Sequence, residues 1–332
     1  MGHITDSNYI SNKQTDMKEN QPIGKLVVDA QGTEKEIYPR TSFPDKKQVT
    51  LNPQEFEEAV QRISSLKENA SVGQKEAIWQ PILDKPNKPF TFLFLTDVHY
   101  LSTKIEYALL EKFLTTVRET PNMALVTGGD DCDNFNVQLG KAATGVYEDP
   151  FEAGFQARAW RQRIGELDKL GKVGFMTFGN HTEWSYKGGI DWSDTFLGDM
   201  NCPILTSGGL VHLKVGEQNY DVAVTHKYWG TSKLNPTNAC KRFLEHEYPE
   251  ADIVLLGHTH QSENLQFERG GKDRIGIIGG TLKLYDDFAR KHGIGGRAGY
   301  PGHTVTVWPD RNRMTSNKFF DIAVQDHINR LN

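Results

Sequence analysis

The sequence predicts an α/β fold, and three features of its 332 residues support this prediction. From Phe90 onward, short runs of aromatic, β-branched and aliphatic residues alternate with longer amphipathic segments, as in a sheet whose strands are joined by helices. After residue 270 the apolar runs follow one another closely, which predicts further strands. Polar clusters come directly after several of these runs, at the strand ends where open α/β sheets form their sites.

Residues 1–89 are predicted to be an N-terminal extension, in which residues 1–20 form a flexible arm. Residues 24–28 and 36–38 have the composition of short strands. A helix is predicted at about 53–68, because Asn52 can cap it, Pro53 suits its first position and Glu55 completes a capping box. The Pro- and Lys-rich residues 81–89 are predicted to link this extension to the main domain, residues 90–332.

The main domain opens with residues 90–95, a continuous run of β-formers that predicts a buried strand. The elements predicted after it are a helix at 109–117 and strands at 124–126, 173–176, 222–224, 253–256, 275–278 and 304–307. The segment at about 135–171 is interpreted as a helical insertion, because residues 149–152 repeat the capping pattern and an amphipathic stripe follows. Since the insertion leaves directly from a polar cluster, we expect it at the rim of the site.

Composition and charge narrow the class of protein. The net charge of −5 does not indicate a broad nucleic-acid-binding surface, although a local basic patch remains compatible with it. No apolar run reaches membrane-spanning length, so we expect no membrane partner. The N-terminus lacks the apolar core of a signal peptide, and the three cysteines are sparse, so we expect a reduced, cytoplasmic location.

Five polar clusters carry the chemistry of the chain. They are Asp97-Val98-His99, Gly129-Asp130-Asp131-Cys132-Asp133, Gly179-Asn180-His181, His226, and Gly257-His258-Thr259-His260. Taken singly, Asp-x-His is more often a surface pair than a ligand, Gly-Asp is usually a turn, and the 258–260 cluster would hold one metal loosely. All five clusters follow predicted strands, at the carboxyl ends where sites of open α/β sheets form. Carboxylate, imidazole and amide donors suit manganese, iron or zinc, and the thiolates of a structural zinc site are missing from the set.

The order of these clusters resembles the calcineurin-like metallophosphoesterase family, over residues 90 to roughly 310. The resemblance implies two packed β-sheets flanked by helices, and the strand-rich C-terminal part would supply the second sheet. The fold class we predict is therefore α/β (α+β), a metallophosphoesterase-like two-sheet β-sandwich.

The resemblance also implies a ligand set for two divalent metal ions, for which manganese is expected and iron or zinc are alternatives. Asp97, His99 and His260 would hold the first ion. Asn180, His226 and His258 would hold the second, and Asp130 would bridge the two. A hydroxide between the ions would attack phosphorus in line.

Two further residues receive catalytic roles from the resemblance. His181 would lie beside the phosphoryl group, either as general acid to the leaving oxygen or as a stabiliser of the transition state. Asp133 matches the position whose carboxylate hydrogen-bonds this histidine, which would fix its tautomer and favour the imidazolium.

The sequence departs from the phosphoprotein phosphatase branch of the family at two positions. Where that branch has an arginine that grips the substrate phosphate, this chain has Asn134, a candidate substrate-binding residue. That branch also has glutamate directly after Gly-Asn-His, whereas here Thr182 precedes Glu183. Both differences count against a phosphoprotein substrate and favour a phosphate with two ester bonds and one negative charge.

Two loops are candidates for binding the rest of the substrate. Tyr228 and Trp229 follow His226 and could stack a base, although packing at the rim explains them equally well. Arg290, Lys291 and Arg297 lie in a Gly-rich basic segment that could meet phosphates, although a solvated loop is the simpler interpretation.

The leading hypothesis is a dimetal phosphodiesterase or nuclease whose partner is a nucleotide or single-stranded nucleic acid. The alternatives are a phosphomonoesterase for a small metabolite or phosphoprotein, and a scaffold that keeps the fold without catalysis. Retention of His181 favours an enzyme over a scaffold. An oligomer formed through the N-terminal extension is compatible with the sequence.

Overall fold

The structure is a computed structural model that describes residues 75–135, 150–187, 200–232, 234–284 and 300–332, together with 25–28, 34–37, 54, 57, 58 and 61. The chain divides into two compact units, Met1–Asn69 and Ala70–Asn332. In the first unit, β1 (Lys25–Val28) pairs antiparallel with β2 (Glu34–Ile37), close to the two strands predicted there. The four described residues between 54 and 61 are helical, and the rest of the predicted helix lies outside the described residues.

The second unit contains two six-stranded sheets, which confirms the predicted two-sheet α/β class. The first sheet, in spatial order, consists of β11 (Glu263–Arg269), β12 (Lys272–Ile278), β10 (Ile253–Leu256), β9 (Gln218–Thr225), β8 (Gly209–Val215) and β3 (Glu76–Trp79). The second consists of β14 (Met314–Asn317), β13 (His303–Val307), β4 (Phe90–Leu95), β5 (Met123–Thr127), β6 (Val173–Thr177) and β7 (Ile204–Leu205).

Each sheet contains a run of neighbouring parallel strands. β4, β5, β6 and β7 run parallel, with Phe92 opposite Ala124, and β13 joins β4 antiparallel. In the other sheet β9, β10 and β12 run parallel, with Leu255 between Val224 and Ile277. The carboxyl ends of the parallel strands in each sheet therefore share one edge.

The core lies in three layers. Alternate residues of β4 point to opposite faces, so Phe92 and Phe94 enter the cluster between the sheets while Leu93 and Leu95 face the helices. All six residues of β4 are buried, as predicted for a strand covered on both faces. A third cluster packs one helix against the outer face of the β9–β10–β12 sheet.

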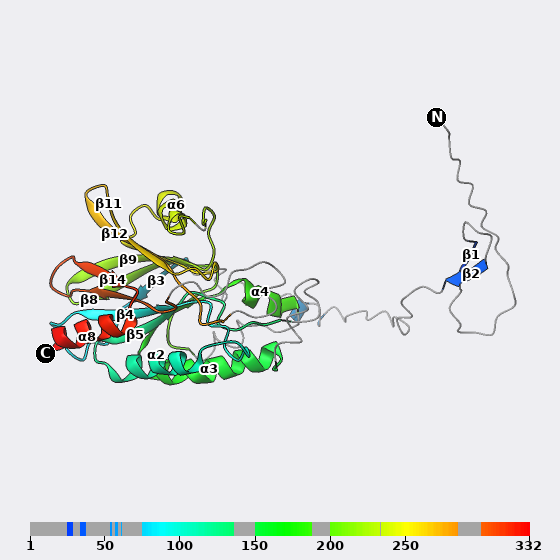
Figure 1. The fold of residues 1–332 in the computed structure, drawn as a ribbon, viewed down its shortest axis with the longest axis horizontal. Coiled ribbons are helices and arrows are strands. Elements are labelled where there is room, and N and C mark those ends of the chain that lie inside the picture. The colour runs from blue at the N-terminus through cyan, green and yellow to red at the C-terminus, as the bar shows by residue number, and fades with distance from the viewer. Residues whose placement is uncertain are drawn as a thin grey trace, which may run out of the picture. The chain divides into compact units, whose positions relative to one another are not determined.

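Five helices cover the sheets in the described ranges (Figure 1). They are α2 (Tyr107–Glu119), α3 (Ala153–Lys169), α4 (Asn180–Lys187), α6 (Asn238–His246) and α8 (Phe320–Leu331). Helices α2 and α3 lie along the outer face of the β4–β5–β6 sheet, and α6 lies on the other sheet (Figure 1). Among the described helices, none has both the length and the apolar character needed to cross a bilayer.

The described part of the predicted insertion packs against the sheet, and its Gln156 accepts a hydrogen bond from Asn134 N beside the candidate site. Its helix α3 begins at Ala153, with Glu152 rather than Asp149 at the N-cap, and Trp160 and Ile164 bury in the main core. Phe151 and Phe155 stack on each other and remain exposed. The helix is thus a layer of the domain, and the segment before it, 136–149, lies outside the described residues.

The domain boundary also differs from the expected one at residues 89 and 90. β3 pairs in parallel with β8, and Trp79 packs edge-on against Phe90 and Phe175 in the core between the sheets. Residues 75–89 therefore belong to the sandwich, because a four-residue strand before the Pro-rich stretch completes the edge of a sheet.

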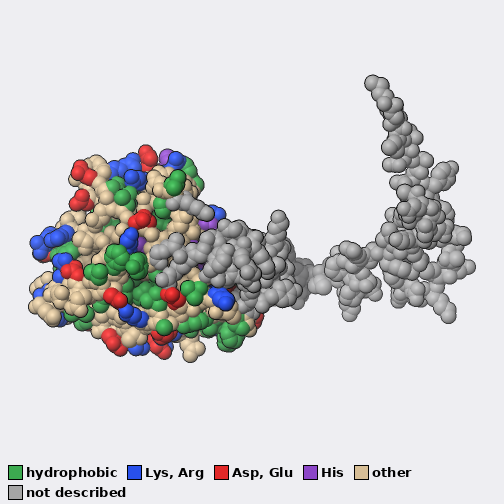
Figure 2. Space-filling view, in the orientation of Figure 1, with side chains coloured by type: hydrophobic (Ala, Val, Ile, Leu, Met, Phe, Trp, Pro, Cys, Tyr) green, Lys and Arg blue, Asp and Glu red, His purple; other side chains and the backbone are tan. Residues whose placement is uncertain are grey.

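The surface carries both signs of charge. On the face drawn in Figure 2, Lys and Arg side chains are interspersed with Asp and Glu, in keeping with the small net charge of the whole chain.

Candidate metal centre

Loops that follow the parallel strands bring the predicted ligands together from both sheets. The loop after β4 carries Asp97 and His99, the loop after β5 carries Asp130, and α4 begins at Asn180 just after β6. From the other sheet, His226 follows β9 and the 257–260 loop follows β10. These loops hold one another, since Asp97 N donates to Gly129 O at 2.9 Å and Gly257 N donates to His226 O at 3.0 Å.

The backbone at these ligands adopts an uncommon conformation. Five of the eight described non-glycine residues with positive φ are predicted metal ligands, namely Asp97, His99, Asp130, His258 and His260. Such angles cost about 1 kcal/mol or more for a residue with a side chain and persist where surrounding contacts fix them.

Two glycines in the ligand clusters, Gly179 and Gly257, lie so close to neighbouring side chains that no Cβ would fit. A Cβ on Gly179 would lie 2.1 Å from Asp130 Oδ1, and a Cβ on Gly257 would lie 2.1 Å from Thr96 Oγ1 and 2.9 Å from Asp97 Oδ2. The glycines before Asn180 and His258 therefore make room for the two carboxylates.

The first group of candidate ligands is Asp97, His99 and His260, whose donor atoms lie within 4.8 Å of one another. Asp97 Oδ2 accepts hydrogen bonds from Thr96 Oγ1 and His258 N, which leaves Oδ1 facing His260 Nε2 at 3.2 Å. His99 Nε2 lies 3.1 Å from His260 Nε2. Neighbouring donors that share a metal at about 2.1 Å lie about 3 Å apart, so the spacing fits one ion.

The second group is Asp130, His226 and His258, with the same compactness. His226 Nδ1 donates to Gly128 O at 2.8 Å, which leaves Nε2 facing Asp130 Oδ2 at 2.9 Å. Asn180 Oδ1 is buried and has no hydrogen-bond partner among the described residues. An acceptor left unpaired in this way fits the amide ligand predicted for this ion.

The electrostatics of the centre favour cations. His226 is buried, which lowers its pKa, but the charges of Asp130 and Asp97 outweigh burial and raise the pKa to about 9. Burial likewise raises the pKa of Asp97, yet His226 and His260 bring it down to about 2. Buried Asp97 Oδ1 and His226 Nε2 have no hydrogen-bond partner among the described residues. Charged carboxylates that face imidazole nitrogens at each group fit a divalent metal there.

His181 lies between the two groups at the start of α4. Its backbone N–H donates to Asp130 Oδ1 at 2.9 Å, and its Nε2 lies 3.7 Å from Asp130 Oδ2. The rings of Trp184 and Phe135 pack on it, with centroids 3.9 and 5.5 Å away. Burial lowers the pKa of His181 to about 4, and the charge of Asp130 opposes this shift only in part.

Asp133 contacts the two histidines differently from the predicted arrangement. Its backbone carbonyl, rather than its carboxylate, accepts the hydrogen bond from His181 Nδ1 at 2.6 Å. Its carboxylate Oδ1 lies 2.6 Å from His99 Nδ1, within ion-pair distance but off hydrogen-bond alignment, and 2.7 Å from Lys283 Nζ. The Asp133 side chain thus points toward the first ligand group, and His181 has the Asp133 carbonyl as its hydrogen-bond acceptor. A neutral carbonyl stabilises the imidazolium of His181 less than a carboxylate would.

Of the candidate substrate-binding residues, the structure describes Asn134, Tyr228 and Trp229. Asn134 is fully buried, and its Nδ2 donates to His181 O while its backbone N–H donates to Gln156 Oε1. The Cζ atom of Arg242 lies 4.2 Å from the ring centroid of Trp229, and the ring of Trp229 stacks on His246.

The neighbouring ring of Tyr228 packs on Phe243, and its hydroxyl donates to Glu247 Oε1. Both aromatic rings of this loop thus have partners on or next to α6, as rim packing predicts. Arg290, Lys291 and Arg297 lie outside the described residues.

Several residues of the centre were not predicted. Lys283 holds Asp133, Thr281 Oγ1 donates to Asp97 O at 2.6 Å, and Trp184 covers His181. Thr281 and Lys283 follow β12, a parallel strand of the same sheet edge. The expectation that site residues follow the carboxyl ends of parallel strands, which located the five clusters, therefore also holds for Thr281 and Lys283.

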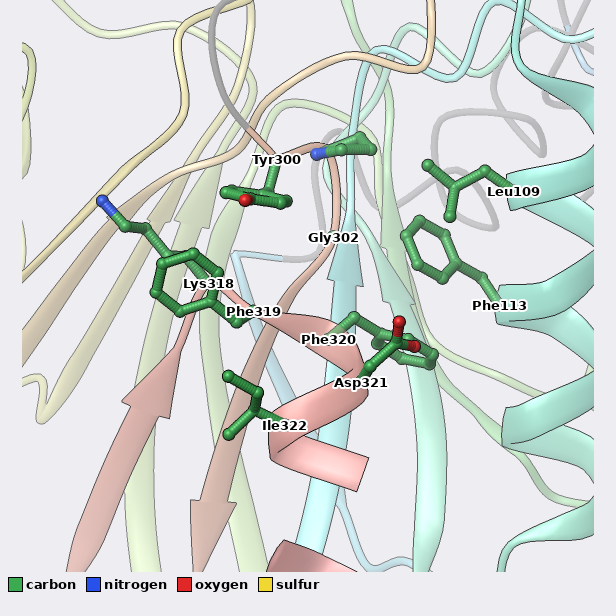
Figure 3. Close-up of a pocket in the computed structure, with 10 residues that line it drawn as sticks. Leu109, Phe113, Tyr300, Gly302, Lys318, Phe319, Phe320, Asp321 and Ile322 are labelled. Carbon is green, nitrogen blue, oxygen red and sulfur yellow. The ribbon is translucent and has the colours of Figure 1, made fainter. Parts of the chain in front are cut away.

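An apolar pocket of about 330 Å³ lies beside the start of α8 (Figure 3). Leu109 and Phe113 of α2 face the ring of Phe320, and Tyr300 meets Phe319 edge-on at 4.9 Å (Figure 3). The predicted metal ligands do not line this pocket. Its rim is tied to the loop after β10, because Ser262 Oγ donates to Tyr300 O at 2.5 Å.

The fold and the two ligand groups define a metal-dependent phosphoesterase. The family model described as calcineurin-like phosphoesterase matches residues 90–262, just over half of the sequence, and the chain therefore belongs to the calcineurin-like phosphoesterase family. This family uses a dimetal centre, and the groups around Asp97 and Asp130 provide residues that could hold the ions. A comparison with curated protein sequences finds no significant match.

Solved structures with a similar chain path are distant in sequence. Vps29 from Cryptosporidium parvum is 12% identical, with a TM-score of 0.37, covering 70% of this chain and 98% of that chain. Nuclease MPE from Pseudomonas putida is 13% identical, with a TM-score of 0.31, covering 68% of this chain and 87% of that chain. Zn+2-complexed Vps29 from Entamoeba histolytica is 12% identical, with a TM-score of 0.34, covering 69% and 97%. Similarity at this level does not distinguish between substrates.

Proposed function

We propose that this protein hydrolyses phosphodiester bonds in a nucleotide or in nucleic acid. The observation that carries the proposal is Asn134, a neutral and fully buried side chain whose amide is engaged by His181 O. The phosphoprotein phosphatase branch has an arginine at this position for a doubly charged phosphate. A neutral side chain bonded within the protein favours a phosphate with one negative charge.

The two ligand groups would each hold one divalent cation, with Asp130 between them and Asn180 completing the second group. When bound, the cations would activate a water molecule and neutralise charge on the phosphoryl oxygens. Manganese is the metal we propose, and iron or zinc would satisfy the same donors.

His181 is proposed to act on the leaving oxygen. Since its Nδ1–H is donated to the carbonyl of Asp133, Nε2 is the atom that faces the centre. The imidazole is neutral at pH 7 before substrate binds, because burial lowers its pKa to about 4. The charge of a bound phosphate would favour a proton on Nε2, from which it could be donated or could stabilise the departing oxygen.

The size of the substrate is proposed from charge. Interspersed acidic and basic side chains on the face in Figure 2 and the net charge of −5 favour a small nucleotide or a single strand. Proteins that bind duplexes neutralise many phosphates with lysine and arginine.

The test compares kcat/KM for a chromogenic phosphate bis-ester and the matching mono-ester, with manganese present. We expect the bis-ester to be preferred, and an Asn134→Arg variant to shift the preference toward the mono-ester. A strong preference of the parent protein for the mono-ester would refute the diesterase proposal while leaving the metal centre intact.

A further inference from the structure

Lys283 is a buried lysine beside the candidate metal centre, and the proposed hydrolysis assigns it no role. It lies in the loop after β12, and only 6% of its surface is exposed. Its Nζ lies 2.7 Å from Asp133 Oδ1 and 5.2 Å from the centroid of Phe135. A buried ammonium is stable only when a counter-charge lies close by, so this lysine and the Asp133 carboxylate depend on each other.

The backbone around Lys283 is fixed to the loop that carries the first ligand group. Lys283 N donates to Thr281 Oγ1 at 2.9 Å, and Thr281 Oγ1 donates to Asp97 O at 2.6 Å. Residues 105 and 283 also form an isolated antiparallel bridge. The segment that carries the Lys283 ammonium is therefore hydrogen-bonded, through Thr281, to the backbone of Asp97.

A continuous path of contacts leads from Lys283 to the first metal group. Asp133 Oδ1 accepts a hydrogen bond from Lys283 Nζ and lies 2.6 Å from His99 Nδ1. All three side chains are buried. His99 Nε2 then faces His260 Nε2 at 3.1 Å. The outer nitrogen of His99 thus lies at ion-pair distance from a buried carboxylate, and such a carboxylate commonly neighbours the outer nitrogen of a metal-binding histidine.

We infer that Lys283 is a positioning residue, which holds the Asp133 carboxylate and through it His99 in the orientation that retains the metal of the Asp97–His99–His260 group. Without the ammonium, the buried carboxylate would have no full counter-charge and would be expected to leave its position. His99 would then lose the partner of its outer nitrogen. The Asp130–His226–His258 group does not contact Asp133 through this path, so its metal would be retained.

The inference concerns metal retention and does not depend on the substrate. It would stand if the protein preferred a phosphate mono-ester, and it can fail while diester hydrolysis is still observed.

The test titrates metal-free protein with Mn²⁺ by calorimetry and follows thermal unfolding of the same samples. For Lys283→Met, we expect one of the two manganese ions to bind about 10- to 100-fold more weakly, the usual effect of losing an outer-shell partner. The other ion should bind as in the parent protein. Lys283→Arg, which keeps the charge, should restore much of the lost affinity.

A matched control is Lys172, whose Nζ donates to three backbone carbonyls at the opposite end of β6, those of Val117, Thr120 and Met123. Lys172→Met should lower the unfolding temperature without changing either manganese affinity. If Lys283→Met fails to fold, Lys283→Gln provides the same comparison, because it keeps a donor but removes the charge.

Two results would overturn the inference. One is a Lys283→Met or Lys283→Gln protein that binds both ions as tightly as the parent. The other is a parallel weakening of both ions, which would show that Lys283 supports the fold rather than His99.

Discussion

The carboxylate of Asp133 is directed at His99, with Oδ1 2.6 Å from Nδ1, and not at the neighbouring His181. His181 instead donates to the backbone carbonyl of Asp133 at 2.6 Å. One residue thus contacts both histidines through different atoms, and a side-chain substitution can separate the two contacts.

Replacing Asp133 by asparagine should affect metal binding more than leaving-group chemistry. The carbonyl that holds His181 remains, whereas the charge that pairs with His99 and Lys283 is lost. We expect manganese affinity to fall about 10- to 100-fold. At saturating manganese, the dependence of rate on leaving-group pKa should match that of the parent protein.

The complementary variant is His181→Ala. It should retain two manganese ions and lose about 10²- to 10⁴-fold in kcat, with the largest loss for poor leaving groups. If Asp133→Asn instead bound manganese normally and shared this leaving-group profile, the carboxylate would be acting on His181.

Replacing Gly179 by alanine should displace Asp130, since the new Cβ would lie 2.1 Å from Asp130 Oδ1. We expect loss of manganese and of hydrolysis, measured as metal content after dialysis and as turnover. The control is Gly165→Ala within α3, where a Cβ has no neighbour within 4 Å. That change should stabilise the protein by about 0.5–1 kcal/mol in urea denaturation and leave metal content unchanged. A Gly179→Ala protein with normal metal content would contradict the packing described for this loop.

Two tryptophans near the site should respond differently to substitution. Trp184 packs on His181 at a tilt, with centroids 3.9 Å apart, whereas Trp229 contacts Arg242 and His246 of α6. Trp184→Leu should lower kcat about tenfold or more, because small displacements of a catalytic group are costly, without loss of metal. Trp229→Leu should leave kcat and KM close to the parent values. A large rise in KM for Trp229→Leu would instead support base stacking by that ring.

His303 should make the protein less stable in mild acid. Burial lowers the pKa of its imidazole from 6.5 to about 4, so the unfolded chain takes up a proton more readily than the folded one. Its contribution is complete above pH 6.5 and is lost as the pH falls toward 4, by about 3 kcal/mol in total. Urea denaturation at several pH values should show a flatter dependence for His303→Gln than for the parent. Equal slopes for the two proteins would contradict this origin.

Much of the fold could be predicted because its strands are strongly patterned. β4 is apolar at every position, which predicts burial on both faces, and the central strands of both sheets occur where apolar runs were found. β3 escaped prediction because only four residues form it and their burial alternates beside a Pro-rich stretch. The outer placement of α3 depends on packing against the sheet, which its amphipathic stripe alone does not specify.

The sequence predicts which polar residues lie together at the strand ends, but not the network of contacts among them. Strand ends locate Asp97, Asp130 and His226, and the packing of the two sheets brings these ends together. Sequence does not show whether the side chain or the carbonyl of Asp133 faces His181, because that depends on one turn of backbone. Lys283 has no motif of its own, and its role becomes visible only through its distance from Asp133.

The central claim is that two metal ions held by these clusters drive phosphodiester hydrolysis. The most direct measurement is a titration of metal-free protein with Mn²⁺ that follows bis-ester hydrolysis and bound manganese together. We expect activity to appear only as the second ion binds and to reach its maximum at two ions per chain. Full activity with one ion, or no activity with two, would contradict this account.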